Sequence, residues 1–247
     1  MKTSDRIWFC LPPLFQEVYA ELVLQDLKEI HWTLSAPTSE KLKSCKIPDS
    51  LFNLYQLETL YCVGFGLTGP FPLNIYHLSR LVFLNLSSNE LRGELPLALF
   101  TLSSLKSLDL SRNRLSGTIP RDFDKLVHLE DLWLQFNAFT GPIQSSIGAL
   151  TRLWGLSLSN NSFDPGPIPD AFHTLTELAE LSLQRCNLTG KIPRWIGTFA
   201  HLRVLDLSRN WLEGDVPNEI AQLPHLFEVG MDSVNALSYT DGGSEDI

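Results

Sequence analysis

The chain has 247 residues, of which 44% are hydrophobic and 19% are charged, a balance typical of a globular domain with a sizeable core. Its 28 acidic and 19 basic residues give a formal net charge of −9. Nucleic acid and anionic lipid both attract basic surfaces, so this charge argues against either as a partner. No apolar run approaches the roughly 20 residues that a membrane-spanning helix needs.

The N-terminal region, residues 1–46, precedes the regular part of the sequence and is expected to form a helical cap. Lys2 and Arg6 stand before an apolar stretch, residues 7–15, but two prolines interrupt it, and it is short even for a signal peptide. This weak signal favours a cytoplasmic protein. Apolar residues at helical spacing predict an amphipathic helix that covers the N-terminal end of the core: Leu14, Val18, Leu22, Leu27, Ile30 and Leu34.

From Leu57 onward one pattern, L-x-x-L-x-L-x-x-N-x-L, repeats with a step of 24 residues, except for one step of 25. Leucines two apart on a strand point to the same side, so each copy predicts a short strand with its leucines inward. Stacked copies bury these leucines in a continuous core. Residues 47–231 therefore predict an α/β fold, a right-handed solenoid with about eight parallel strands on its concave face. The copies begin at Leu57, Leu81, Leu105, Leu129, Leu153, Leu178, Leu202 and Leu226.

A column of asparagines marks the point where each copy leaves its strand. A side-chain amide buried in a stack must find hydrogen-bond partners, and the backbone of adjoining coils can supply them. Cysteine takes one of these positions, and Cys62 takes a core position, where a free thiol acts as a small hydrophobe. We therefore expect a structural ladder formed by Asn89, Asn113, Asn137, Asn161, Cys186 and Asn210.

The second half of most copies has the form L-x-G-x-φ-P, where φ is apolar, as in residues 91–96, 115–120 and 188–193. Proline fixes φ and removes a backbone donor, which favours short 3₁₀ turns on the convex side. This 24-residue pattern resembles the plant-type leucine-rich repeats of receptor-like kinases, receptor-like proteins and polygalacturonase-inhibiting proteins. The usual N-terminal cap of that family, with paired cysteines around a tryptophan, has no match here. The resemblance implies ligand binding on the concave face and, as an alternative location, the cell surface or the extracellular space.

Residues known for catalysis or cofactor binding do not form a convincing set. Residues 64–69 spell G-x-G-x-x-G, but the last glycine belongs to the turn of the repeat, and a proline follows where a helix should begin. Three histidines share one repeat position without a carboxylate or cysteine that would complete a metal site. We therefore expect no enzyme activity, no cofactor and no metal. The histidines are His128, His201 and His225.

The candidate binding site is the outward row of the concave strands. Most outward positions hold small or polar residues, and aromatic residues gather near the middle copies. Aromatic rings flanked by charges have the composition of an interaction hot spot. Arg112 and Phe136 share a column on adjacent strands, so the guanidinium is expected to stack on the ring. The predicted partner-binding residues are Tyr61, Phe83, Asp109, Arg112, Asp131, Trp133, Gln135 and Phe136.

The sequence leaves three functions open. The first is a non-enzymatic recognition module for a protein or peptide. The second is a structural subunit that joins a larger assembly through its uncapped C-terminal end. The third, implied by the resemblance, is an inhibitor of a secreted polysaccharide hydrolase. Residues 232–247 hold four acids and no base, and they are predicted to form a disordered tail.

Overall fold

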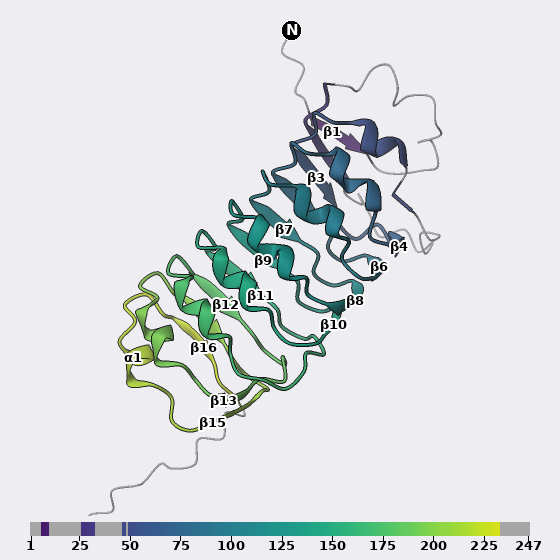
Figure 1. Cartoon of the computed structure of the whole chain (residues 1–247). Coiled ribbons are helices and arrows are strands. Elements are labelled where there is room, and N and C mark those ends of the chain that lie inside the picture. The colour runs from purple at the N-terminus through teal and green to yellow at the C-terminus, as the bar shows by residue number, and fades with distance from the viewer. Residues whose placement is uncertain (1–5, 10–25, 33–45, 48, 233–247) are drawn as a thin grey trace, which may run out of the picture.

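A computed structural model describes residues 6–9, 26–32, 46, 47 and 49–232. These residues form a stack of coils that runs from the N-terminus to the C-terminus (Figure 1). One sheet of ten parallel strands lines the stack, and its order follows the chain. Its last eight strands, from β3 onward, are those that the repeats predict. The strands are Arg6–Phe9 (β1), Glu29–Trp32 (β2), Thr59–Cys62 (β3), Phe83–Asn85 (β5), Ser107–Asp109 (β7), Asp131–Trp133 (β9), Gly155–Ser157 (β11), Glu180–Ser182 (β12), Val204–Asp206 (β14) and Glu228–Gly230 (β16).

The strands β1 and β2 come from the region for which we predicted a helical cap. Ile30 lies in β2, pairs with Leu60 of β3 and is buried. The predicted helix is therefore wrong at residues 29–32, because a strand added there pairs the open edge of the sheet. Most of the remaining predicted helix lies outside the described residues. So does the predicted tail, apart from Asp232.

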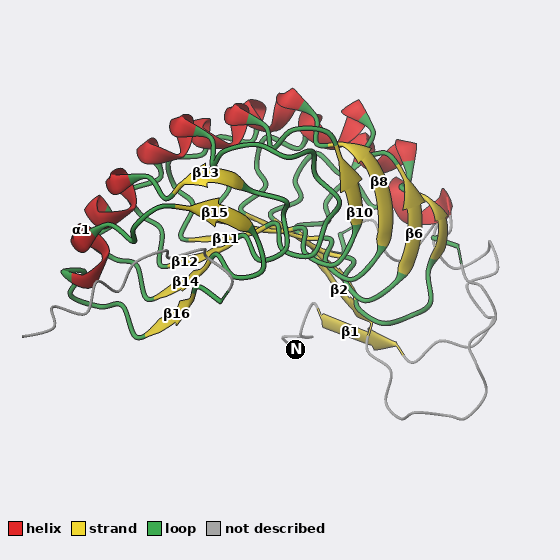
Figure 2. Cartoon of the chain, turned by 90° about the horizontal axis from the view of Figure 1, so that it is seen from below, coloured by secondary structure: helices red, strands yellow, loops and turns green. Residues whose placement is uncertain are grey.

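Short helices cover the convex side of the stack (Figure 2). In the sequence a proline stands immediately before seven of them and a glutamine before η5. Proline suits a helix start because the first backbone N–H groups have no partner within the helix. The prediction of short 3₁₀ turns is confirmed, with one α-helical turn at the end. The helices are Asp49–Asn53 (η1), Leu73–His77 (η2), Leu97–Thr101 (η3), Arg121–Lys125 (η4), Ser145–Ala149 (η5), Asp170–Thr174 (η6), Arg194–Thr198 (η7) and Asn218–Ala221 (α1).

Two lateral sheets, which we did not predict, join the strand side to the helix side. Between them lies the 25-residue repeat, where Gly166 forms an isolated bridge to Leu188. The extra residue of that repeat interrupts the ladder, so the lateral pairing is split in two. The first sheet contains Thr68–Pro70 (β4), Glu90–Gly93 (β6), Arg114–Thr118 (β8) and Ala138–Thr140 (β10), and the second contains Thr189–Lys191 (β13) and Trp211–Glu213 (β15).

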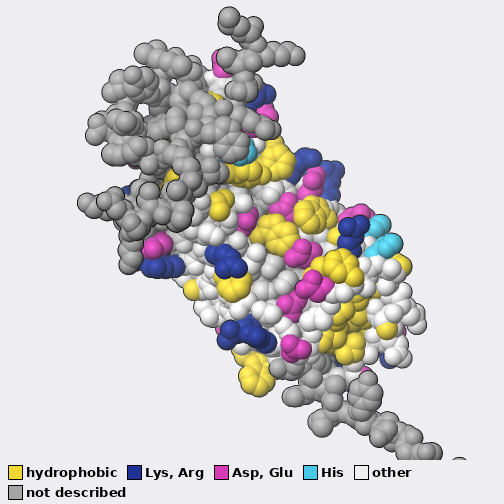
Figure 3. All heavy atoms as spheres, turned by 180° about the vertical axis from the view of Figure 1, so that it is seen from behind, with side chains coloured by type: hydrophobic (Ala, Val, Ile, Leu, Met, Phe, Trp, Pro, Cys, Tyr) yellow, Lys and Arg dark blue, Asp and Glu magenta, His cyan; other side chains and the backbone are white. Residues whose placement is uncertain are grey.

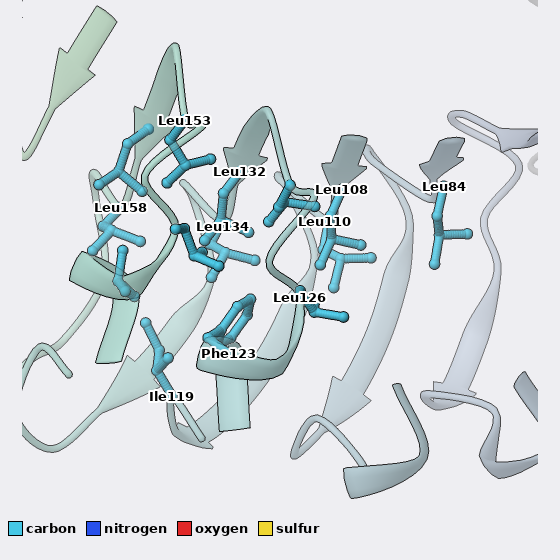
Figure 4. Packing of buried hydrophobic residues seen from close by; sticks show 14 of the residues in the cluster. Leu84, Leu108, Leu110, Ile119, Phe123, Leu126, Leu132, Leu134, Leu153 and Leu158 are labelled. Carbon is cyan, nitrogen blue, oxygen red and sulfur yellow. The ribbon is translucent and has the colours of Figure 1, made fainter. Parts of the chain in front are cut away.

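The core lies between the main sheet and the helices. Figure 4 shows Leu84, Leu108 and Leu132 pointing inward from successive strands, with Phe123 rising toward them from η4. All four side chains are fully buried. Burial of one such side chain stabilises a fold by roughly 1.5–3 kcal/mol. At the C-terminal end Val229 takes a leucine position but is 48% exposed, because no further described strand pairs with β16.

The asparagine column forms hydrogen bonds that connect successive coils. Asn113 accepts a hydrogen bond from the N–H of Leu91 at 3.0 Å. Its Nδ2 donates to the carbonyl groups of Leu86 at 2.9 Å and Leu110 at 3.1 Å. This amide thus ties its own coil to the preceding one. The same pattern recurs at Asn89, Asn137, Asn161 and Asn210.

Cys186 takes the asparagine position in the sixth coil with weaker bonds. Its thiol donates to the carbonyl oxygen of Leu158 at 3.3 Å, while Asn210 accepts from its backbone N–H at 2.9 Å. Burial raises the pKa of the Cys186 and Cys62 thiols. Both thiols therefore stay protonated at neutral pH and serve as small core side chains.

Candidate functional site

The register of the main sheet places five of the eight predicted partner-binding residues in two rows that cross the strands, while Arg112, Gln135 and Phe136 follow the strand ends. In one row Thr59, Phe83, Ser107, Asp131 and Gly155 are successive partners. The other row begins at Tyr61 and continues through Asn85, Asp109, Trp133 and Ser157. In Figure 3, which shows the strand side, hydrophobic side chains form a band with acidic side chains among them.

Trp133 is held over the neighbouring strand by three contacts. A Cβ atom at Gly155 would lie 2.7 Å from Cζ2 and 2.8 Å from Cη2 of its indole, so the ring occupies the space that this glycine leaves open. The ring of Trp154 meets it edge-on, with centroids 6.0 Å apart and planes at 69°. The Trp133 side chain also lies close enough to the Asp131 carboxylate to favour its ionised form. These contacts fix the ring at the surface of the sheet.

Trp154 and Gly155 are parts of this site that we did not predict from the sequence. Trp154 lies immediately before β11, at a position where other copies carry Glu58, Lys106 or Glu130, and it is 44% exposed. The signal in the sequence was the combination of a tryptophan at this position with a glycine in the first outward position of the strand. That combination occurs in this copy alone.

Arg112 and Phe136 form the expected stack. The Arg112 guanidinium carbon lies 4.5 Å from the centroid of the Phe136 ring, which is 42% exposed. Both residues have positive φ, 54° and 57°, as do the residues at this position in most other coils. A left-handed backbone costs a side-chain-bearing residue about 1–2 kcal/mol. Positive φ recurs at this repeat position with different side chains, so the turn does not require arginine or phenylalanine, and the stack is a feature of this surface.

The acidic residues are held by neutral donors. Asp109 accepts from Nδ2 of Asn85 at 3.1 Å and from the N–H of Ser111 at 2.9 Å. Asp131, which is 9% exposed, accepts from the Ser107 hydroxyl at 2.7 Å. Burial raises the pKa of Asp131, and the nearby Asp109 carboxylate adds to that rise. Both acids are thus fixed in place.

Tyr61 extends the site toward the N-terminus. Burial, followed by the charges of Asp131 and Asp109, raises the pKa of its hydroxyl. Its ring meets that of His31 edge-on, with centroids 4.8 Å apart. The hydroxyl therefore stays protonated and can donate a hydrogen bond.

Phe83 and Gln135 complete the predicted set. The Phe83 ring is 37% exposed and lies in the row of Asp131, two strands away. Gln135 lies between Trp133 and Phe136 in the chain, and its Oε1 is buried without a described hydrogen-bond partner. The structure thus brings Asp109, Asp131, Trp133 and the Arg112–Phe136 stack onto two adjoining coils. Tyr61 and Phe83 lie further along the same face.

The described ranges contain neither a candidate metal site nor a candidate membrane span. No three His, Cys, Asp or Glu side chains among those residues gather as a metal site would require. Within the same ranges, no helix has the length and apolarity needed to cross a membrane. The chemistry of the face is therefore that of its rings, carboxylates, amides and guanidinium groups.

Solved structures with the same architecture include plant receptor ectodomains. That of GASSHO1/SCHENGEN3 from Arabidopsis thaliana, in complex with CASPARIAN STRIP INTEGRITY FACTOR 2, has a TM-score of 0.74 and 34% identity, covering 84% of this chain and 25% of its own. The Arabidopsis receptor kinase HAESA ectodomain, with an N-terminally extended IDA peptide hormone, has a TM-score of 0.73 and 37% identity, covering 75% and 31%. A plant ice-binding protein has a TM-score of 0.62 and 29% identity, covering 76% and 60%.

The chain spans 25% to 31% of the length of these two receptor ectodomains. No curated protein sequence matches it. The family model for the leucine-rich repeat region matches residues 38–239, which is most of the chain. The coils, the asparagine ladder and this match agree, and the chain belongs to the plant-type leucine-rich repeat family.

Proposed function

We propose that this chain is a non-enzymatic recognition module that binds a peptide, or an extended segment of a protein, across its concave face. The observation that carries this proposal is the fixed Trp133 ring. A ring held by Asp131, Trp154 and the space at Gly155 loses little conformational freedom when a ligand covers it. Preorganised aromatic side chains of this kind supply much of the binding energy of interfaces.

The relatives support a peptide as the ligand. Two receptor ectodomains with this architecture were solved with CASPARIAN STRIP INTEGRITY FACTOR 2 and with an IDA peptide hormone. The concave rows of this chain offer rings, carboxylates and amides along one line, which suits an extended chain. Membership in a recognition family also agrees with a non-enzymatic role.

The proposal is tested by replacement of Trp133 with alanine. Natural partners are recovered with the wild-type chain, identified by mass spectrometry, and their affinities are then measured for each variant. Loss of a hot-spot residue typically costs about 2 kcal/mol or more, so Trp133→Ala should weaken binding at least about tenfold. The fold should survive, because the side chain lies outside the leucine core.

Trp195→Ala is the matched control. Trp195 lies on the convex side in η7, where its indole donates to the carboxylate of Asp170 at 3.1 Å. Its removal deletes the same kind of side chain, also close to a carboxylate, on the opposite face. Binding that falls equally for both variants, or for neither, would contradict a site centred on Trp133.

An end-to-end contact at the C-terminal coil is the second candidate. Phe227 is 74% exposed and Val229 is 48% exposed at the edge strand β16. A structural subunit that docks through this end should lose its partner with Phe227→Ser and keep it with Trp133→Ala. The same affinity measurements therefore separate the two candidates.

A further inference from the structure

Five carboxylates occupy the middle rows of the concave sheet. None of them pairs with a lysine or arginine in the described part of the chain. Acids at the border of the same face behave differently: Lys28 pairs with Glu58 at 2.7 Å, and Lys106 pairs with Glu130 at 2.8 Å. The middle rows thus keep an uncompensated negative charge. The five are Asp109, Asp131, Glu180, Asp206 and Glu228.

Neutral donors fix several of these carboxylates without reducing their charge. Asp206 accepts from Nε2 of Gln184 at 3.0 Å and from the N–H of Ser208 at 3.0 Å. Amide and hydroxyl donors hold Asp109 and Asp131 in the same way. These acids are therefore oriented in advance, and a cationic group that reaches them meets fixed acceptors.

The carboxylates form two groups on either side of β11. The first acid pair is Asp109 on β7 with Asp131 on β9, and the second is Glu180 on β12 with Asp206 on β14. The strand between them carries Gly155 under the Trp133 ring. Neighbouring strands lie about 4.8 Å apart, so the centres of the two pairs are three strand steps, or about 14 Å, apart.

We propose that the concave face selects an extended cationic peptide, with basic residues at positions i and i+4 and an apolar residue at i+2. An extended chain advances about 3.4 Å per residue, so four residues span about 14 Å, and side chains at i, i+2 and i+4 point to one side. The two basic side chains then meet the two acid pairs, and the apolar one rests on Trp133 and Trp154. This inference rests on the proposed function.

The border of the face supports this orientation. Arg112, Arg185 and Arg209 are exposed and follow their strands at the same repeat position. Their positive charges repel a basic ligand from the border of the face. The rows of acids are then the favourable place for it to bind. Aromatic faces also attract guanidinium and ammonium groups, which adds to the preference for a cation over Trp133. A neutral oligosaccharide would stack on the rings and donate hydroxyl groups to the carboxylates, but it would bring no positive charge to balance theirs.

The probes for the test are three blocked, fluorescently labelled nonapeptides. One contains Arg-Ser-Leu-Ser-Arg, the second has the same composition with its two arginines adjacent, and the third has glutamate in place of both arginines. Fluorescence anisotropy at low ionic strength should show at least tenfold tighter binding of the first than of the second. The third should not bind, and added salt should weaken binding of the first.

Acid-to-amide variants locate the contact. Asp109→Asn and Glu180→Gln should each weaken binding of the first peptide at least fivefold. The control is Glu213→Gln on the lateral strand β15, which removes the same charge away from the concave face and should leave binding unchanged. Replacement of Asp131 is unsuitable here, because that carboxylate also holds Trp133.

Several outcomes would overturn the inference. They are equal affinity for the two arginine peptides, no binding of any peptide, equal effects of Glu180→Gln and Glu213→Gln, and competition by a neutral oligosaccharide. The natural partner separates this inference from the proposed function. If its binding falls with Trp133→Ala but not with Asp109→Asn or Glu180→Gln, the function stands and the charge preference is wrong. If Trp133→Ala has no effect either, the proposed function fails as well.

Discussion

Gly155→Ala is the sharpest test of how the concave face is built. The Cβ atom of this alanine would lie 2.7 Å from Cζ2 of Trp133, whereas carbon atoms in contact normally lie about 3.5–4.0 Å apart. The Trp133 ring must therefore move by about 1 Å or swing away. The ring borders solvent, so it can leave its position without disturbing the leucine core.

The cost to stability is small because gains and losses nearly cancel. Displacement of the ring removes an edge-on contact with Trp154, worth about 0.5–1.5 kcal/mol. Replacement of glycine by alanine in an unstrained backbone returns about 0.4–1 kcal/mol. The free energy of unfolding should change by no more than about 1 kcal/mol, against a typical total of 5–15 kcal/mol. Partner binding should nevertheless fall as far as in Trp133→Ala.

The assay combines near-ultraviolet circular dichroism, a denaturant titration and the affinity of the natural partner. Gly166→Ala is the matched control, because it makes the same substitution where the nearest atom to a new Cβ atom is 4.0 Å away. Only Gly155→Ala should alter the tryptophan signal and lose affinity. Wild-type affinity together with an unchanged near-ultraviolet spectrum would refute the placement of the Trp133 ring over Gly155.

Three further predictions concern the ladder and the buried acid. Asn113→Leu should lower the free energy of unfolding by about 1–3 kcal/mol, because it leaves the Leu91 N–H unpaired and removes one of the two amide donors to each of the Leu86 and Leu110 carbonyl groups; an unchanged denaturation midpoint would contradict the ladder. Cys186→Asn should raise the free energy of unfolding by about 1 kcal/mol, since an amide restores bonds that the thiol makes weakly or not at all; a lower midpoint would contradict this. Burial raises the pKa of Asp131 in the folded state, so ionisation of this group costs stability as the pH rises through that pKa. Asp131→Asn should therefore gain stability relative to wild type between pH 3 and pH 7 in parallel titrations, and a constant difference would show that Asp131 is not the group responsible.

The repeat region could be predicted because its signals are local and periodic. Each leucine of the template is explained by the inward face of a strand, and each proline by the start of a convex turn. The N-terminal region could not be predicted, because the spacing of Leu27, Ile30 and Leu34 fits a helix and does not reveal the strand that forms at Ile30. The strand at Ile30 forms through pairing with β3, which lies 30 residues away in the chain, and short-range spacing contains no information on such a partner.

The candidate site was predictable in part for a related reason. Outward positions follow from the strand period, so Trp133, Phe136 and Arg112 could be assigned to the concave face. The direction in which the Trp133 ring leans could not be predicted, because it depends on the free space beside Gly155 and on the edge-on contact with Trp154. The uncompensated charge of the middle rows was also hidden, since it depends on where lysine and arginine side chains end.

Core and outward positions have separate roles within each repeat, which explains why the concave face can change without loss of the fold. Leucines and ladder asparagines bury their side chains or bond to backbone, so a substitution there leaves a cavity or an unpaired group. Outward residues of the strands contribute little to the core, and their side chains cost little to exchange. A repeat that keeps its core and ladder can therefore carry Trp133, Gly155 and Trp154 on two adjoining coils. In such a fold, binding and stability should respond to different substitutions. A variant that changes only binding identifies an outward residue, and a variant that changes only stability identifies a core or ladder residue.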